Sequence, residues 1–318
     1  MSRSPDDSAP RSGKEPWYRD RTNSFPLSWV RLFLVGLVLW MASVLVTAVT
    51  GNFNMIPTVV LLGSFLVPVT AVVWYMDHYE SPSVNVRHVF DAFLIGGVLG
   101  VLAASLLEAY LIGNGPLAYL GVGLIEEGAK LLALYFIARR LPSHTVRDGV
   151  VLGAAVGFGF AALESSGYAL TALIVLQGGH VYFSLGNVVF TELLRGVLSP
   201  IGHGLWTGIV GGVMFGATRA GRLRLRSWSV LGAYLAVSLL HALYDAMGAI
   251  ALLLTAVVTG SSTTQLSSDR VALDTVLQVA GIVLISALGL MWLRRLWRRR
   301  RNPDEPGPAP APGPGPAA

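Results

Sequence analysis

Eight long apolar stretches make up most of this chain and limit what it can fold into. A helix needs about 20 mainly apolar residues to cross a bilayer, and each stretch is close to that length or longer. Only 13% of the residues are charged, whereas a soluble domain usually has about 25%. The sequence therefore predicts an all-α, polytopic transmembrane helical bundle with about eight spans, near residues 28–50, 55–76, 90–112, 117–138, 149–175, 201–219, 229–258 and 276–293.

The basic residues indicate how these spans are oriented. If the N-terminus is cytoplasmic, 20 of the 23 Lys and Arg residues lie in or beside cytoplasmic segments, and only Arg195 and Arg270 lie outside. Cytoplasmic segments of membrane proteins carry such an excess of basic residues. We therefore expect both termini in the cytoplasm and a multi-pass protein of a bacterial plasma membrane. The net charge of +5 follows from this pattern, so nucleic acid is not an expected partner.

The two ends of the chain differ in composition from the membrane domain between them, residues 28–296. Residues 1–27 are polar and rich in Pro, Ser and Arg, which predicts a disordered cytoplasmic tail without a cleavable signal peptide. Residues 297–318 carry four arginines at 298–301 and then many Pro, Gly and Ala residues, a composition that cannot bury a core and predicts a second disordered cytoplasmic tail. The apolar stretch 184–200 contains a Glu and an Arg, and we interpret it as an interfacial or re-entrant segment.

Small residues recur within several of the apolar stretches. Gly153, Gly157 and Gly159 are one example, and the glycines between 208 and 216 are another. Such residues let helices approach closely in lipid. We therefore predict helix packing at these positions, with a surface for substrate approach as the alternative.

The fourth stretch contains three ionisable residues, Glu126, Glu127 and Lys130. A charge at the bilayer centre costs at least about 2.5–3.5 kcal/mol, so such groups pair with one another or have a function. Both carboxylates lie within one helical turn of Lys130, but one ammonium neutralises only one carboxylate. Adjacent helical residues point about 100° apart, so the second glutamate needs its own partner, a proton or a metal ion. We interpret it as a glutamate that activates water or shares a proton. A buried ion pair that only joins helices is the alternative.

Four more ionisable residues lie in other apolar stretches: Glu164, His203, His241 and Asp245. Glu164 has no basic residue within one turn, so its partner must come from another helix. His203 stands near the external end of its predicted span, where a capping role and a ligand role are both open. His241 and Asp245 are four residues apart and project from one helix face. They suit two ligands of one ion, a His oriented by a carboxylate, or a packing contact.

Several hydrolase types are excluded by missing motifs. The chain has no His-Glu-x-x-His, no Gly-x-Ser-x-Gly and no cysteine. Only one Asp, Asp245, lies deep in an apolar stretch, whereas an intramembrane aspartyl protease needs two. Carboxylates and imidazoles on separate helices are nevertheless the components of a hydrolytic or metal site.

Four motifs occur in an order that resembles a known family. They are Glu126-Glu127-x-x-Lys130, Phe160-x-x-x-Glu164, Arg195 followed by His203-x-x-Trp206, and His241-x-x-x-Asp245. Over about residues 90–260 the chain resembles PrsW-type intramembrane proteases, which are distant relatives of the CAAX-processing and bacteriocin-immunity membrane proteases. The resemblance implies an intramembrane endopeptidase. Its partner would be a single-span membrane protein, such as an anti-sigma factor, cleaved near its extracytoplasmic end.

The resemblance leaves two mechanisms open. In the first, which we prefer, Glu164, His203 and His241 bind a metal ion, with zinc as the candidate, and Glu127 is the general base. In the second, Glu126 or Glu127 deprotonates water without a metal. His241 with Asp245 then stabilises the oxyanion, and Lys130 keeps the other carboxylate ionised. The CAAX relatives carry His where this chain has Glu164, so their ligands do not transfer directly.

Two other classes of protein compete with a protease. A proton- or cation-coupled transporter would also place carboxylates within the membrane, but the sequence shows no internal repeat of the kind that many transporters have. A catalytically inactive membrane scaffold is the third possibility, and the complete set of polar motif residues counts against it.

Overall fold

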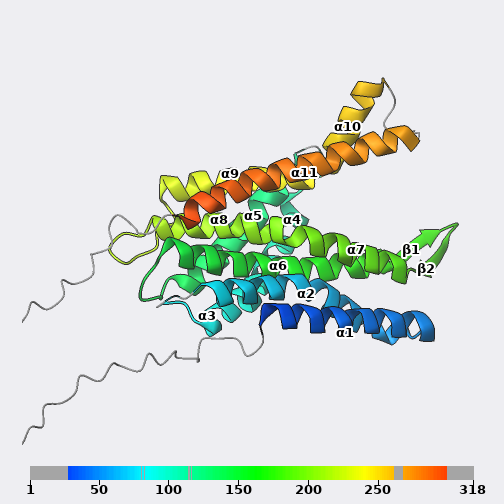
Figure 1. Ribbon diagram of the computed structural model, residues 1–318. Helices are drawn as coiled ribbons and strands as arrows, with labels where there is room; N and C mark the ends of the chain where they lie inside the picture. The colour runs from blue at the N-terminus through cyan, green and yellow to red at the C-terminus, as the bar shows by residue number, and fades with distance from the viewer. Residues whose placement is uncertain are drawn as a thin grey trace, which may run out of the picture.

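The computed structural model describes residues 28–79, 81, 83–113, 115, 117–260 and 268–298. Its helices form one elongated bundle (Figure 1). Each of the eight apolar stretches contains helix, so the predicted all-α membrane bundle is confirmed. The helices are α1 (Trp29–Thr50), α2 (Ile56–His78), α3 (Val86–Asp91), α4 (Gly97–Leu111), α5 (Ala118–Ala138), α6 (Val146–Leu173), α7 (Leu185–Leu198), α8 (His203–Gly216), α9 (Trp228–Asp245), α10 (Met247–Thr259) and α11 (Ser268–Trp297).

Six of these helices or helix runs are long and apolar enough to cross a membrane. The bent pair α9 and α10 makes a seventh if it is one span. Helix α5 has 21 residues, which is also sufficient. It differs from the six because every 18-residue stretch of it contains all three of its charged residues, whereas each of the six has an apolar 18-residue stretch with at most two. The tails predicted to be disordered, residues 1–27 and nearly all of 297–318, lie outside the described residues.

Helix α6 is the centre of the bundle. In the 18-residue apolar stretch of α6 that could lie in the membrane, 89% is buried within the protein, against 17% for the corresponding stretch of α1. Helix α8 packs along it, and the glycines of α6 allow the two backbones to touch. A Cβ added at Gly149, Gly153 or Gly157 would overlap the backbone of α8, and one at Gly159 would overlap the carbonyl of Phe93. The prediction that these small residues serve packing is confirmed.

The sequence predicted a separate interfacial or re-entrant segment at 184–200, but the structure joins this segment to the sixth span. Helix α7, a short 3-10 turn at Ser199–Ile201 and α8 follow one another as a single 32-residue run (Figure 1). The two charged residues of α7 have partners within the protein: Glu192 accepts a hydrogen bond from Trp40 Nε1 at 2.8 Å, and Arg195 pairs with Glu164. Because the protein supplies these partners, the segment can join the bundle, and His203 lies in the middle of the run instead of at its end.

The predicted span 229–258 is broken. Helices α9 and α10 meet at Ala246 with a bend of 58°, and α10 leaves the bundle beside α11 (Figure 1). Asp245 and Gly248, both poor helix formers, flank the break. Asp245 is therefore the last residue of α9, one turn after His241.

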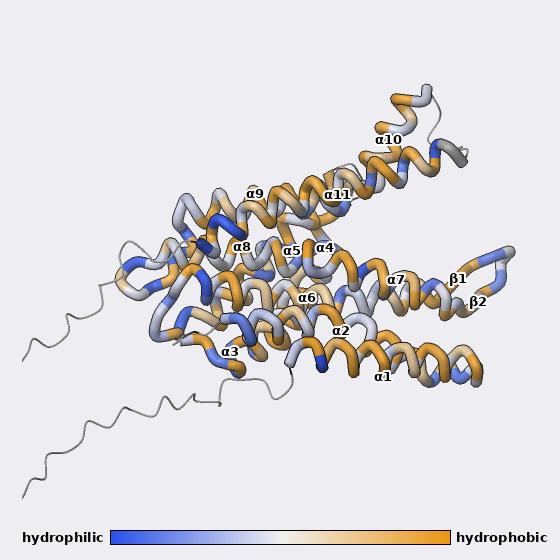
Figure 2. Tube along the Cα trace, viewed as in Figure 1, coloured by the Kyte–Doolittle hydropathy of each residue, from blue (hydrophilic) through white to orange (hydrophobic). Residues whose placement is uncertain are grey.

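A β-hairpin connects α6 to α7. Strand β1 (Ile174–Gln177) pairs antiparallel with β2 (His180–Phe183). The two turn residues, Gly178 and Gly179, have φ of 58° and 79°, as the two-residue turn of a tight hairpin requires. The hairpin continues α6 at the end of the bundle opposite the loops that precede α6 and α9 (Figure 1). Figure 2 shows hydrophilic residues in those loops.

Candidate active site

A cavity of about 480 Å³ lies among helices α4 to α9. It gathers polar side chains that are up to 137 positions apart in the sequence, from Glu108 to Asp245. Five of the seven predicted site residues line it: Glu126, Glu164, His203, His241 and Asp245. The other two, Glu127 and Lys130, lie directly behind this wall.

The two adjacent glutamates have different surroundings. Glu126 lines the cavity, whereas Glu127 is 1% exposed and does not. Glu127 accepts hydrogen bonds from Lys130 Nζ at 2.9 Å and from Thr207 Oγ1 at 3.1 Å, and its Oε1 lies 3.1 Å from His241 Nδ1. Its oxygens are thus occupied by protein partners. The geometry favours Glu126, and not the Glu127 of our preferred mechanism, as the carboxylate that meets a water molecule.

Lys130 connects the two glutamates to the next helix. Its ammonium is fully buried and lies 2.9 Å from a carboxylate oxygen of each glutamate. It is also 2.8 Å from His203 Nδ1 and 3.8 Å from the centre of the Phe160 ring. A single Lys therefore contacts both carboxylates, which differs from the expected one-to-one pairing. The two imidazoles also approach these carboxylates, with His241 Nδ1 3.1 Å from Glu127 Oε1 and His203 Nδ1 3.6 Å from Glu126 Oε2.

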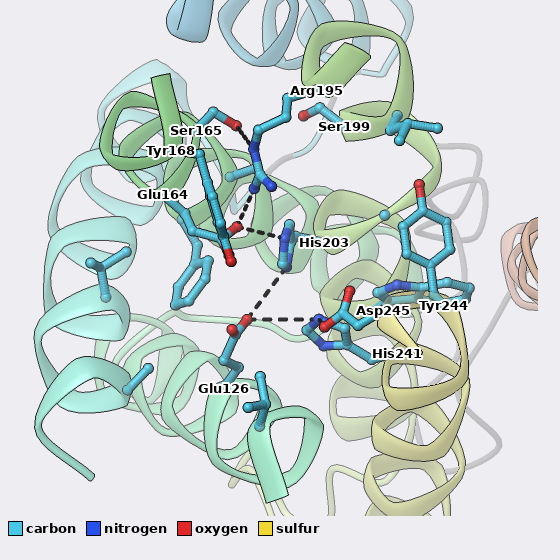
Figure 3. A pocket seen from close by; sticks show the side chains of 18 of the residues that line it. Glu126, Glu164, Ser165, Tyr168, Arg195, Ser199, His203, His241, Tyr244 and Asp245 are labelled. Carbon is cyan, nitrogen blue, oxygen red and sulfur yellow. Dashed lines mark hydrogen bonds and ion pairs between the residues drawn. The ribbon is translucent and has the colours of Figure 1, made fainter. Parts of the chain in front are cut away.

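His241 lies between two carboxylates. Its Nδ1 faces Glu127 at 3.1 Å, and its Nε2 lies 3.3 Å from Asp245 Oδ2 and 3.8 Å from Glu126 Oε2. The expected pairing of His241 with Asp245 is therefore present (Figure 3). Glu127 beside Nδ1 and Asp245 beside Nε2 fix the orientation of the ring, so that Nε2 lies on the side of the cavity.

His203 is held from the opposite side. Its Nε2 lies 2.9 Å from Glu164 Oε2, and its Nδ1 lies 3.6 Å from Glu126 Oε2. Glu164 in turn pairs with Arg195 Nη2 at 2.5 Å, and Arg195 Nε donates to Ser165 Oγ at 2.8 Å. The partners of Glu164 thus come from α7 and α8, as expected for a carboxylate with no basic residue on its own helix. Figure 3 shows this chain of contacts.

The sequence reasoning missed two residues of this site. Thr207 follows His203 by one turn of α8, and this spacing could have drawn attention to it. Glu108, in the last turn of α4, lines the cavity, and its Oε1 is buried without a hydrogen-bond partner. Because Glu108 stands at the end of an apolar stretch, its sequence position looks like an ordinary membrane boundary.

Three of the cavity residues offer donors for a metal ion. One ligand atom each from Glu126, His203 and His241 lie within 4.8 Å of one another. Two imidazoles and a carboxylate form a set that zinc uses in hydrolases, so the donor chemistry fits an ion. The carboxylate is Glu126 instead of the predicted Glu164, whose oxygen already faces Arg195 and His203. Lys130 lies next to two of the three donors, so an ion would have to displace its ammonium toward Glu127.

Comparison with known proteins identifies the family. The model of the PrsW family, described as intramembrane metalloproteases, matches residues 84–285. The chain belongs to the PrsW family. It is 30% identical over 174 residues to Protease PrsW of Halalkalibacterium halodurans, covering 53% of this chain and 73% of that protein. Over 176 residues it is 27% identical to Protease PrsW of Geobacillus kaustophilus, covering 53% of this chain and 69% of that protein. No solved structure matches. The chain is thus a multi-pass intramembrane protease.

Proposed function

We propose that this protease cleaves a single-span membrane protein near its extracytoplasmic end and that Glu126 activates the water. The observation that carries the proposal is the position of Glu126. It is the cavity-facing member of the glutamate pair, and its Oε2 lies within 3.8 Å of imidazole nitrogens from two other helices. An anti-sigma-factor-like protein in a bacterial plasma membrane is the substrate class that the resemblance suggests.

In this mechanism Glu126 acts first as general base and then as proton carrier. It takes a proton from a water in the cavity while that water attacks the scissile carbonyl carbon. The same proton then goes to the leaving amine as the C–N bond breaks. General acid–base catalysis of this kind contributes about 10²- to 10⁴-fold. The ammonium of Lys130, 2.9 Å from Glu126 Oε2, holds this carboxylate in place before the water is deprotonated.

His241 is suited to stabilise the oxyanion that forms on the carbonyl oxygen. Its Nδ1 faces Glu127 and its Nε2 faces the cavity beside Asp245. In this proposal the ring carries a proton on each nitrogen, one directed at Glu127 and the other at Asp245 and the cavity. Its Nε2–H then points to the place where negative charge develops, and a preorganised donor of this kind is effective in a water-poor site.

A metal ion would use overlapping residues. If one binds, with zinc as the candidate, Glu126, His203 and His241 would hold it, and it would polarise the scissile carbonyl and activate the water. Elemental mass spectrometry of protein purified in detergent without chelator tests this version against the His203→Ala/His241→Ala double variant. Near-stoichiometric metal in the parent and none in the variant would support it. No metal in either would support the mechanism with carboxylate alone.

The proposal is tested by comparing membranes from bacteria that express the wild-type chain or Glu126→Gln. New N-termini in single-span proteins are labelled and sequenced by mass spectrometry. We expect cuts near extracytoplasmic ends with the wild type and none with Glu126→Gln at equal expression. Cuts that persist in the variant would remove Glu126 from the mechanism, and an absence of cuts with the wild type would contradict the proposed substrate class.

A further inference from the structure

The β-hairpin has two free edges and connects two helices of the cavity. Helix α6, which carries Glu164, leads directly into β1, and α7, which carries Arg195, follows β2. The sheet has two strands, and within the described part of the chain no third strand pairs with them. An isolated two-stranded hairpin is only marginally stable in water. The backbone groups along its edges can accept another extended chain.

The hydrogen-bond register shows which backbone groups face outward. Ser184 N donates to the carbonyl of Leu173 at 2.8 Å, so this pair, just outside the strands, is hydrogen-bonded. Hydrogen-bonded and non-hydrogen-bonded pairs alternate along an antiparallel ladder. Leu176 and Val181, which oppose each other, therefore form a non-hydrogen-bonded pair. Their N–H and C=O groups point away from the hairpin, one set at each edge.

The distance from the cavity to the hairpin can be spanned by a short extended segment of a substrate that occupies the cavity. Helix α6 has 28 residues, so it is about 42 Å long, which exceeds a hydrocarbon core of about 30 Å. Glu164 precedes β1 by ten residues, about 15 Å along the helix axis. An extended chain covers that distance in four to five residues, at about 3.3 Å each. A substrate cut beside Glu126 would thus reach β1 about that many residues beyond the scissile bond.

A substrate in this place needs the partners that a free strand edge provides. Hydrolysis requires local unwinding of the substrate helix, and its freed N–H and C=O groups find no water in lipid. The edge of a β-sheet supplies alternating acceptors and donors for an extended peptide, whatever its side chains are. The β1 edge is the better candidate because β2 is flanked by the α1–α2 turn: Phe183 of β2 contacts Phe53, with ring centres 5.6 Å apart.

We propose that the edge of β1, Ile174–Gln177, binds the extracytoplasmic segment of the substrate as a third β-strand. This inference rests on the proposed function. Main-chain pairing would hold the substrate extended from the hairpin to the cavity and would impose little sequence specificity. The exposed side chains of β1, such as Leu176 at 75%, would contact those of the substrate.

Proline substitutions at the opposed pair test the proposal. Leu176→Pro removes one outward N–H from the β1 edge, and Val181→Pro removes one from the β2 edge. Neither removes a hydrogen bond within the hairpin, so the second variant is a matched control. We expect Leu176→Pro to lower the rate of substrate cleavage about tenfold and Val181→Pro to change it less than about twofold. Equal effects of the two variants would overturn the proposal.

Cross-linking separates this proposal from the proposed function. The chain has no cysteine, so Leu176→Cys and Val181→Cys each introduce a single thiol, which forms a disulfide only with a substrate cysteine whose Cβ lies within about 4.5 Å. In a Glu126→Gln background, single cysteines are placed four to nine residues beyond the cut in the proteins that the wild type cuts. We expect Leu176→Cys to form disulfides with them and Val181→Cys to give little product. If the wild type cleaves substrates but the two sites cross-link equally or not at all, the strand pairing is overturned and the proposed function stands. If the wild type cuts nothing, the proposed function fails. In that case, cross-linking of a single-span protein from Leu176→Cys but not from Val181→Cys would still support the strand pairing. If neither site cross-links such a protein, the strand pairing and the proposed function are both overturned.

Discussion

The two sides of the cavity are built differently. On one side, Glu127, Lys130 and His241 are at most 1% exposed, and each contacts at least two partners within the protein. On the other, the side chains of Glu164 and Arg195 are 20% and 24% exposed and pair with each other beside Ser165 and Tyr168. Glu126 and His203 lie between the two sides. The difference indicates that the buried side holds the reacting group in place, whereas the open side admits substrate.

The largest effect is expected where the two sides meet. Glu126→Gln keeps the shape of the side chain but removes the base, so cleavage should fall about 10²- to 10⁴-fold. Thermal stability in detergent should change little, since Gln can still accept a hydrogen bond from Lys130. Cleavage of the substrate and the unfolding temperature are measured on the same preparation. Glu127→Gln is the control: loss of stability together with activity is expected there, because Glu127 contacts Lys130, Thr207 and His241.

Removing the cation of the buried side should damage the fold. Lys130→Met leaves two buried carboxylates without their ammonium, and breaking a buried ion pair in this way typically costs about 3–5 kcal/mol. We expect a markedly lower unfolding temperature in detergent. Rescue by Lys130→Arg would indicate that a hydrogen-bonding cation of any shape is sufficient, since Arg retains both the charge and N–H donors. A Lys130→Met variant with wild-type stability would contradict the description of this side as a positioning unit.

The contact of α6 with α8 offers a smaller perturbation. A Cβ at Gly157 would overlap the backbone of His203, whereas nothing lies within 4 Å of the position of a Cβ at Gly167 on the same helix. Gly157→Ala should destabilise by about 1–3 kcal/mol through overpacking and reduce cleavage by displacing His203. Gly167→Ala should be neutral or stabilising by up to about 1 kcal/mol. Similar unfolding temperatures for the two variants would show that α8 can shift without cost.

The smallest effect is expected on the open side. Arg195→Lys retains the charge but loses the planar group that reaches Glu164 and Ser165 together. Because this pair is partly exposed, its contribution to stability should be at most about 1 kcal/mol. We expect an unchanged unfolding temperature and a severalfold slower cleavage, seen mainly as a higher KM. A strong loss of stability instead would place Arg195 with the buried side.

Several features of this protein were predictable because they depend on neighbouring residues alone. The apolar stretches predict helices in all eight places, since backbone groups in lipid must pair within their own segment. The spacing of His241 and Asp245 placed them on one helix face, and their side chains do pair. The isolation of Glu164 predicted a partner from another helix, and the structure provides Arg195 and His203.

Other features depend on how the helices are rotated and joined. Glu126 and Glu127 point in different directions on α5, but only the packing of α8 and α9 decides which of them reaches the cavity. The depth of His203 follows from the joining of α7 to α8, which requires partners for Glu192 and Arg195 from distant segments. The sequence by itself determined a helical membrane protein with ionisable residues on separate spans, because local periodicity and hydropathy specify helices. The tertiary structure alone decided which ionisable groups of different helices meet one another and which line the cavity, because those contacts join residues more than 30 positions apart.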